Sequence, residues 1–129
     1  MAEPSLGIIV RKPGELPADR SLGPYHLEPL VRRDEEGALT AWHVRLDPGA
    51  VTPASYHLVA EEAYFVLEGR LTARWEEGGR RCEQRLGPRD LLLTPPGQPH
   101  AFRNEGPGTA QFMMVVGTPG VEDVEFRAA

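Results

Sequence analysis

Two histidines and one glutamate fall within two short segments of this chain that are rich in turn-forming residues. His57 and Glu62 lie in the segment 49–69, and His100 lies in the segment 95–104. Two imidazoles and a carboxylate suit a divalent transition metal and leave coordination positions open for substrate or oxygen. These three side chains are the predicted metal ligands, and Glu62 is also the candidate catalytic residue.

Short β-strands must position these side chains. The 14 glycines and 13 prolines are spread along the chain, and the segments between them show period-two alternation or β-branched and aromatic content. No window has a sustained 3.6-residue apolar repeat, so the pattern indicates an all-β sandwich or barrel. The expected strands are 6–10, 25–32, 39–46, 55–58, 63–68, 70–76, 80–86, 91–94, 100–104 and 111–116, with 121–126 as a final edge strand or a loose tail.

Strand alternation predicts which side chains share a face. Steps of two place His100, Phe102 and Asn104 on one face of their strand, and Glu62 and Tyr64 on one face of theirs. If both faces point into a barrel, the interior is an apolar cavity with a few polar groups, as in most small-molecule sites. The predicted substrate pocket consists of Ser55, Tyr64, Phe102 and Asn104.

Composition narrows the classes of protein and partner. The net charge is −5 and no basic cluster is interleaved with aromatics, so we expect no nucleic-acid partner. No apolar run approaches the ~20 residues needed to span a bilayer, and the first residues lack the blocks of a signal peptide. We therefore expect no membrane association and a cytoplasmic location. The single cysteine, Cys82, excludes an internal disulfide and a cysteine-based zinc cluster.

At these spacings the chain resembles the cupin superfamily. The first cupin motif is a glycine, five residues, His-x-His, three or four residues, a glutamate, six residues and a glycine. Here it reads Gly49, five residues, Ser55-Tyr56-His57, four residues, Glu62, six residues and Gly69. The resemblance extends over residues from about 39 to 126.

The second cupin motif is a glycine, five residues, Pro-x-Gly, two residues, a histidine, three residues and an asparagine. Pro95-Pro96-Gly97, His100 and Asn104 match it, and Arg89 stands in place of its glycine. The ending Thr118-Pro119-Gly120 resembles that of small bacterial cupins related to quercetin dioxygenases.

The resemblance implies a double-stranded β-helix, or jelly roll. It implies a single domain over residues 1–129, with a barrel core at about 39–117, N-terminal strands within 6–32 and a tail at 118–129. The family holds its metal with three histidines and one glutamate, and His57, Glu62 and His100 match three of these positions. Ser55 departs from the first, and a serine hydroxyl is a poor ligand for a transition metal.

The three matching ligands have the composition of the triad that supports Fe(II) oxygen chemistry. They favour a dioxygenase-like oxidoreductase that acts on a small organic substrate with Fe, Mn, Ni or Zn. Glu62 would be a ligand or, when detached, a base. Asn104 is a candidate for orienting a ligand, although the Glu-Gly-Pro-Gly that follows it favours a turn-forming role.

Two alternative functions stay open at this point. The barrel could bind a small molecule without turnover, with a degenerate metal site, or it could be a sugar isomerase or epimerase. The second is less favoured because no lysine–arginine cluster that could grip a phosphate lies near the site. His43 could supply a further ligand if it points inward, and Tyr64 and Phe102 could be plain core.

Because cupins of this size commonly pair through barrel edges, we expect a homodimer.

Overall fold

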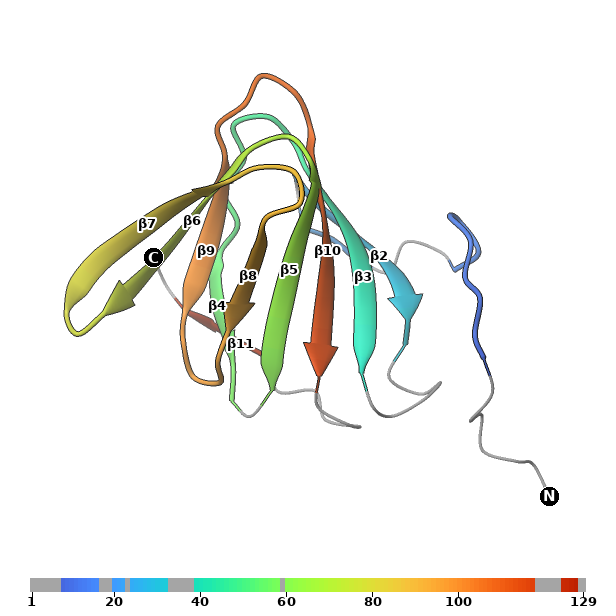
Figure 1. Cartoon of the computed structure of the whole chain (residues 1–129), viewed down its shortest axis with the longest axis horizontal. Helices are drawn as coiled ribbons and strands as arrows, with labels where there is room; N and C mark the ends of the chain where they lie inside the picture. The colour runs from blue at the N-terminus through green and yellow to red at the C-terminus, as the bar shows by residue number, and fades with distance from the viewer. Residues whose placement is uncertain are drawn as a thin grey trace.

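A computed structural model shows two antiparallel β-sheets that face each other as the halves of a barrel (Figure 1). The structure describes residues 8–16, 20–22, 24–32, 39–58, 60–117 and 124–127. Its strands are β1 Arg20–Leu22, β2 Tyr25–Val31, β3 Thr40–Leu46, β4 Ala54–His57, β5 Glu61–Glu68, β6 Leu71–Glu77, β7 Arg80–Leu86, β8 Leu91–Thr94, β9 His100–Asn104, β10 Ala110–Gly117 and β11 Val124–Arg127.

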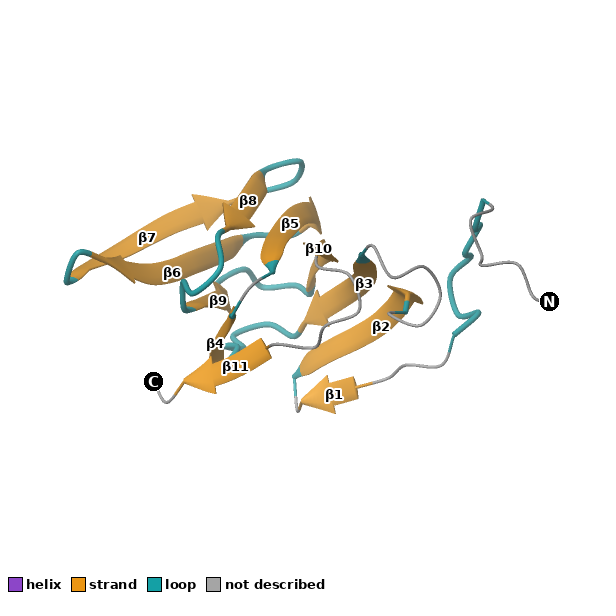
Figure 2. Cartoon of the chain, turned by 90° about the horizontal axis from the view of Figure 1, so that it is seen from below, coloured by secondary structure: helices purple, strands orange, loops and turns teal. Residues whose placement is uncertain are grey.

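The order of strands in the two sheets is that of a jelly roll. One sheet has the order β1-β2-β3-β10-β5-β8 and the other the order β11-β4-β9-β6-β7. Strands far apart in the sequence therefore lie side by side, such as β3 with β10 and β4 with β9 (Figure 2). The predicted all-β, double-stranded β-helix class is confirmed. The ranges that the structure describes hold no helix long and apolar enough to cross a membrane.

The core lies between the two sheets and follows from period-two alternation. Along β10, Ala110, Phe112, Met114 and Val116 are buried, and the residues between them are more exposed. Phe112 is fully buried, and an apolar side chain of this size contributes roughly 1.5–3 kcal/mol when it leaves water. The inward faces of the strands are thus fixed by the same alternation that the sequence shows.

Most of the expected strands are found within one or two residues of their predicted bounds. The exception is 6–10: residues 8–10 are not in a strand, and residues 6 and 7 lie outside the described ranges. The short β1 was not predicted. The last segment forms an edge strand, because β11 pairs with β4. The ending Thr118-Pro119-Gly120, which carries part of the resemblance, also lies outside the described ranges.

Two turns of the barrel require unusual backbone conformations. Gly69, which closes the first motif, has a φ of +87°, and a Cβ there would lie 2.8 Å from the Cα of Ala110. Arg89, which stands where the second motif has glycine, has a φ of 73°. Its N–H donates to the carbonyl of Val66 at 2.8 Å, so the turn keeps the left-handed conformation although a side chain there costs about 1–2 kcal/mol.

Candidate metal centre

Three strands bring the predicted ligands to one end of the barrel. His57 is the last residue of β4, Glu62 is the second residue of β5, and His100 is the first residue of β9. These strand ends lie together at the lower end of the barrel in Figure 1. The three side chains are at most 12% exposed, so a centre at this point is largely closed to bulk water.

The carboxylate of Glu62 contacts both imidazoles. Its Oε2 lies 3.2 Å from Nε2 of His57, and its Oε1 lies 3.3 Å from Nε2 of His100. No hydrogen bond is directed at Oε1, although this atom is buried. The contact with His100 is therefore a close approach of polar atoms that leaves one carboxylate oxygen unsatisfied.

The ring of His100 is oriented by hydrogen bonds at both nitrogens. Its Nδ1 lies 2.8 Å from the carbonyl of Gln98, and a carbonyl can only accept, so Nδ1 carries a hydrogen. In the neutral imidazole Nε2 then has a free lone pair, which accepts from the hydroxyl of Tyr64 at 2.6 Å. A histidine that donates its other N–H to a backbone carbonyl is in the tautomer that metal-binding histidines use.

An aromatic cluster forms the floor beneath these polar groups. Tyr64 packs edge-on against Phe102 and Phe112, with ring centroids 4.7 Å and 5.9 Å away. Tyr64 and Phe102 are each 3% exposed. Both therefore belong to the core and at the same time line the barrel interior below His100, which merges the two roles that the sequence left open.

Electrostatics in the site favour an ionised Glu62. Burial alone would raise the pKa of Glu62, but the close contacts with His100 and His57 outweigh it and lower that pKa to about 2. Burial and the charge of Glu62 raise the pKa of Tyr64 well above its usual range. The same two causes, burial first, raise the pKa of Tyr25. Tyr25, which lies outside both motifs, was not predicted from the sequence to be near the site.

Ser55 faces the interior beside His100. The register of β4 and β9 places Ser55 directly opposite His100, and the register of β9 and β6 places Trp75 opposite His100 on the other side. Residues directly opposite in antiparallel strands project from the same face. Trp75, which sequence reasoning missed, is partly buried against the core, so His100 has a small hydroxyl on one side and a large apolar ring on the other.

Asn104 performs a different task from the one proposed for a ligand-orienting residue. Its Nδ2 donates to the carbonyls of Leu46, Asp47 and Gly108, at 2.8–3.2 Å, and its Oδ1 accepts from the N–H of Gly106 at 2.9 Å. These bonds join the turn after β3 to the turn after β9. The turn-forming interpretation of Asn104 fits these contacts, because none of these four bonds reaches a predicted ligand.

The other two histidines are directed away from the candidate centre. His43 Nε2 lies 2.8 Å from Oε1 of Gln111 on the neighbouring strand, and His26 Nε2 lies 3.3 Å from the carboxylate of Asp47. The possible role of His43 as a further ligand is therefore not supported. Strand alternation could have indicated this. The neighbouring Val44 is fully buried, and adjacent residues of a strand point to opposite faces.

The donor chemistry of the site fits a divalent metal ion. Oε1 of Glu62 is buried without a hydrogen-bond partner, 3.3 Å from Nε2 of His100, and a cation shared with the imidazoles would be a partner for this oxygen. Within the described ranges, however, no three His, Cys, Asp or Glu side chains already form a metal-binding group. In this structure Glu62 turns one carboxylate oxygen toward each imidazole.

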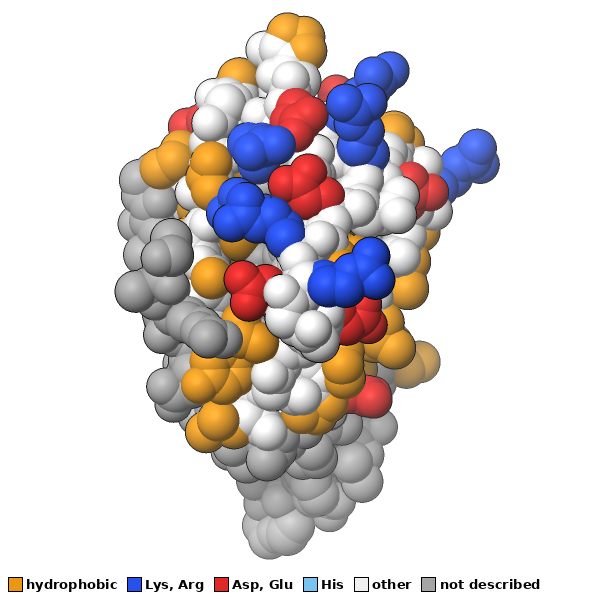
Figure 3. All heavy atoms as spheres, turned by 90° about the vertical axis from the view of Figure 1, so that its left-hand side faces the viewer, with side chains coloured by type: hydrophobic (Ala, Val, Ile, Leu, Met, Phe, Trp, Pro, Cys, Tyr) orange, Lys and Arg blue, Asp and Glu red, His pale blue; other side chains and the backbone are white. Residues whose placement is uncertain are grey.

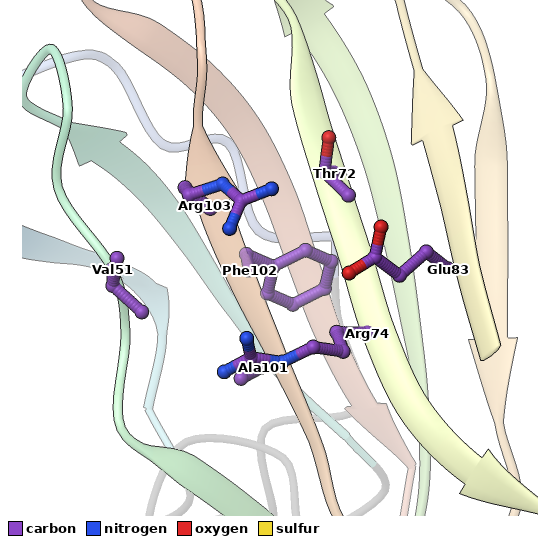
Figure 4. Close-up of a pocket in the computed structure, with 7 residues that line it drawn as sticks. All are labelled: Val51, Thr72, Arg74, Glu83, Ala101, Phe102 and Arg103. Atoms are coloured by element: carbon purple, nitrogen blue, oxygen red, sulfur yellow. The ribbon is translucent and has the colours of Figure 1, made fainter. Parts of the chain in front are cut away.

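A shallow hollow on the outer side of the five-stranded sheet is separate from this centre. Figure 4 shows its lining, which includes Arg74, Arg103, Thr72 and Glu83. Thr72 and Arg74 flank the core residue Ala73 along β6, so their side chains project from the opposite, outer face of the sheet. Basic and acidic side chains intermingle on this side of the molecule (Figure 3).

Comparison with known proteins agrees with the fold. Residues 42–116, more than half of the chain, match the model of the cupin domain family. A conserved protein with a double-stranded β-helix domain from Klebsiella pneumoniae is 20% identical, with a TM-score of 0.72 over 87% of this chain and 91% of its own. Comparison with curated proteins gives no match.

Two further solved structures share the architecture. KdgF from Halomonas sp. is 18% identical, with a TM-score of 0.71 over 84% of this chain and 93% of its own. An oxalate oxidase in complex with glycolate is also 18% identical, with a TM-score of 0.71 over 80% of this chain and 55% of its own. At these identities the similarity establishes the fold alone.

Proposed function

The chain belongs to the cupin family, and on that premise we propose that it is a metal-dependent oxidoreductase. His57, Glu62 and His100 hold a divalent metal, and a small organic molecule is oxidised beside it with dioxygen. This places the chain in the dioxygenase-like part of the family, near the quercetin dioxygenase group. The similarity in fold to an oxalate oxidase with bound glycolate is compatible with this chemistry.

One observation carries the proposal. The Nε2 atoms of His57 and His100 both approach the carboxylate of Glu62, at 3.2 Å and 3.3 Å, in a largely buried pocket where Oε1 has no hydrogen-bond donor. An ionised carboxylate in such a position normally has a complete set of partners, because an unsatisfied buried acceptor costs about 1–3 kcal/mol. A metal shared with the two imidazoles would supply what is missing.

The residues around the centre have distinct tasks in this proposal. A bound metal would supply Lewis acidity and a template for substrate and oxygen. The Gln98 carbonyl fixes the tautomer of His100, and Glu62 acts as ligand or, when detached, as a base. Phe102 and the ring of Tyr64 exclude water from below, and Ser55 can hold a water or a substrate hydroxyl by hydrogen bonding.

The buried polar side chains bear on the class of substrate. The buried polar and charged side chains of the described part are Thr52, Glu62, Thr72, Thr94, His100 and Asn104. This set includes a carboxylate and contains no lysine or arginine. A diol or a hydroxy-ketone could bind a metal through two oxygens. The lack of a lysine or arginine in this buried set, which could hold a phosphate, disfavours a phosphosugar isomerase.

Metal analysis tests the core of this proposal. Protein purified without chelators should contain about one metal ion per chain after reconstitution with Fe(II), Mn(II), Ni(II) or Zn(II), measured by elemental analysis. His57→Ala and His100→Ala should each remove most of it. His43→Ala is the matched control because this histidine lies outside the centre, and thermal unfolding shows whether each variant is folded. Absence of stoichiometric metal in the folded wild-type protein with all four ions would refute the proposal.

Non-catalytic binding is the second candidate, and Ser55 favours it. Because Ser55 replaces a ligand histidine and Glu62 already contacts both imidazoles, the barrel could hold a small molecule without metal or turnover. A ligand that co-purifies with metal-free protein, with no oxygen consumption after metal loading, would support this function. Oxygen consumption that depends on His57 and His100 would exclude it.

A further inference from the structure

We propose that residues 8–12 form a docking segment through which two copies of this chain hold each other. In the homodimer, the docking segment of each copy covers the apolar outer face of β5 and β8 in the other copy. This contact lies on the outside of the six-stranded sheet, away from the candidate metal centre, so the inference does not depend on the proposed function.

Exposure alternates along the docking segment. Ile8, Val10 and Lys12 are exposed, the first two at 95% and 69%, and the residues between them are half-buried. The inner side is held against β2, where Arg11 donates from Nε to the carbonyl of Leu30 at 2.8 Å. The segment therefore presents two apolar side chains and one cation on its outward side.

The docking segment stands apart from the core of its own chain. Figures 1 and 2 show it beyond β2, clear of the barrel. The turn that follows it is anchored on β2, because the N–H of Gly14 donates to Oε2 of Glu28 at 2.8 Å. Apolar side chains are stabilised by leaving water. A second surface that covers Ile8 and Val10 would supply this stabilisation.

The outer face of β5 and β8 needs a cover of the same kind. Phe65 and Leu67 alternate with buried residues along β5. On β8, Leu91 lies opposite Phe65, and Leu93 follows on the same face. These four side chains are 37–60% exposed. A contiguous apolar strip of this kind marks an interaction site, and the outward side of the docking segment is apolar as well.

Exposed acidic residues border this strip at both ends. Glu68 ends β5, Glu61 begins it, and Asp90 precedes β8. The outward Lys12 of a second copy therefore meets a carboxylate whichever way its docking segment runs across the strip. Such charge complementarity at the rim fixes the choice of partner more than the affinity. Two-fold symmetry lets each copy supply one docking segment and one strip, so both are covered in a single pair.

Zero-length crosslinking tests the contact directly. Protein labelled with a heavy isotope is mixed with unlabelled protein, left to exchange, and treated with a carbodiimide. This reagent joins Lys12, the single lysine of the chain, to a neighbouring carboxylate. We expect peptides that join Lys12 of one isotope to Glu61, Glu68 or Asp90 of the other. Crosslinks of Lys12 confined to one isotope would place the segment within its own chain and overturn the inference.

Substitution of the outward apolar side chains gives an independent measurement. Ile8→Asp with Val10→Asp should raise the dissociation constant of the dimer by about tenfold or more, because each docking segment loses two apolar contacts. Sedimentation velocity measures the constant, and circular dichroism shows that the variant is folded. Val51→Asp is the control, because Val51 is 50% exposed beside the other sheet, and it should leave the constant unchanged.

Two further outcomes would contradict the inference. A wild-type chain that is monomeric at micromolar concentration would overturn it. A dimer whose dissociation constant is unchanged in the double variant would also overturn it and would place the interface on the strips alone. None of these measurements involves metal, so they are distinguishable from a failure of the proposed function.

Discussion

Ser55 lies directly opposite His100 in the register of strands β4 and β9, and both side chains project into the barrel. A histidine at position 55 would therefore enter the centre from the face that already carries His57 and His100. We predict that Ser55→His raises the affinity for Ni(II) or Zn(II) at least tenfold, because imidazole is a far better ligand than a hydroxyl. Competition with a chromogenic chelator measures the change.

Ala54→His is the control for this substitution, because alternation directs residue 54 to the opposite face of β4. It should leave the affinity of the centre unchanged. Equal affinities for wild type and Ser55→His would show that position 55 does not reach the metal.

The ionised carboxylate of Glu62 should stabilise the metal-free protein in a pH-dependent way. Its pKa is lowered from 4.5 to about 2 in the folded state, so the unfolded state binds a proton more readily and folding is favoured where the carboxylate is charged. A difference of this size corresponds to about 3 kcal/mol. This contribution is complete above pH 4.5 and is lost as the pH falls toward 2.

Urea unfolding of wild type and Glu62→Gln, both without metal, measures this contribution. The wild type should exceed the variant in unfolding free energy at pH 7, and the difference should shrink as the pH falls from 4.5 to 3. A difference that is independent of pH would contradict a lowered pKa at Glu62.

Asn104 should matter for stability and little for metal binding. Its amide satisfies three backbone carbonyls and one backbone N–H in two neighbouring turns. Asn104→Ala leaves these groups unsatisfied and should lower the free energy of unfolding by about 3 kcal/mol. Chemical denaturation gives this value. At a temperature where the variant is folded, its metal stoichiometry should equal that of the wild type, and a loss of metal would assign Asn104 to the centre.

A homodimer should form through the outer face of β5 and β8. Phe65, Leu67, Leu91 and Leu93 are 37–60% exposed there, and the register places Leu91 opposite Phe65. Monomers rarely leave a contiguous apolar strip in water, and a second copy presents the matching strip, so two-fold pairing buries both at once. Light scattering at micromolar concentration should give twice the mass of the chain.

Leu91→Asp with Leu93→Asp should convert the dimer to monomer. Val51→Asp is the control, since Val51 is equally exposed but lies beside β9, on the other sheet. A wild-type mass equal to one chain would refute the dimer, and a dimer that survives the double substitution would place its interface elsewhere.

The strands and the turns were largely predictable because their causes are local. Alternation along β10 marks which side chains enter the core, and the glycine at position 69 is required by a positive φ and by close approach to Ala110. Residues 8–10 were wrongly predicted to be in a strand, because apolar residues alone do not supply a pairing partner. The three-residue β1 was missed because its pairing with β2 leaves little pattern in so short a segment.

The sequence by itself indicated an all-β barrel, and its resemblance to the cupin motifs added the jelly-roll class and the candidate ligands His57, Glu62 and His100. Only the tertiary structure decided that Glu62 contacts both imidazoles, that Tyr64 reaches His100 and that Asn104 joins two turns. These relationships join residues on different strands. Their geometry depends on sheet register and on core packing across the barrel, which no local pattern encodes.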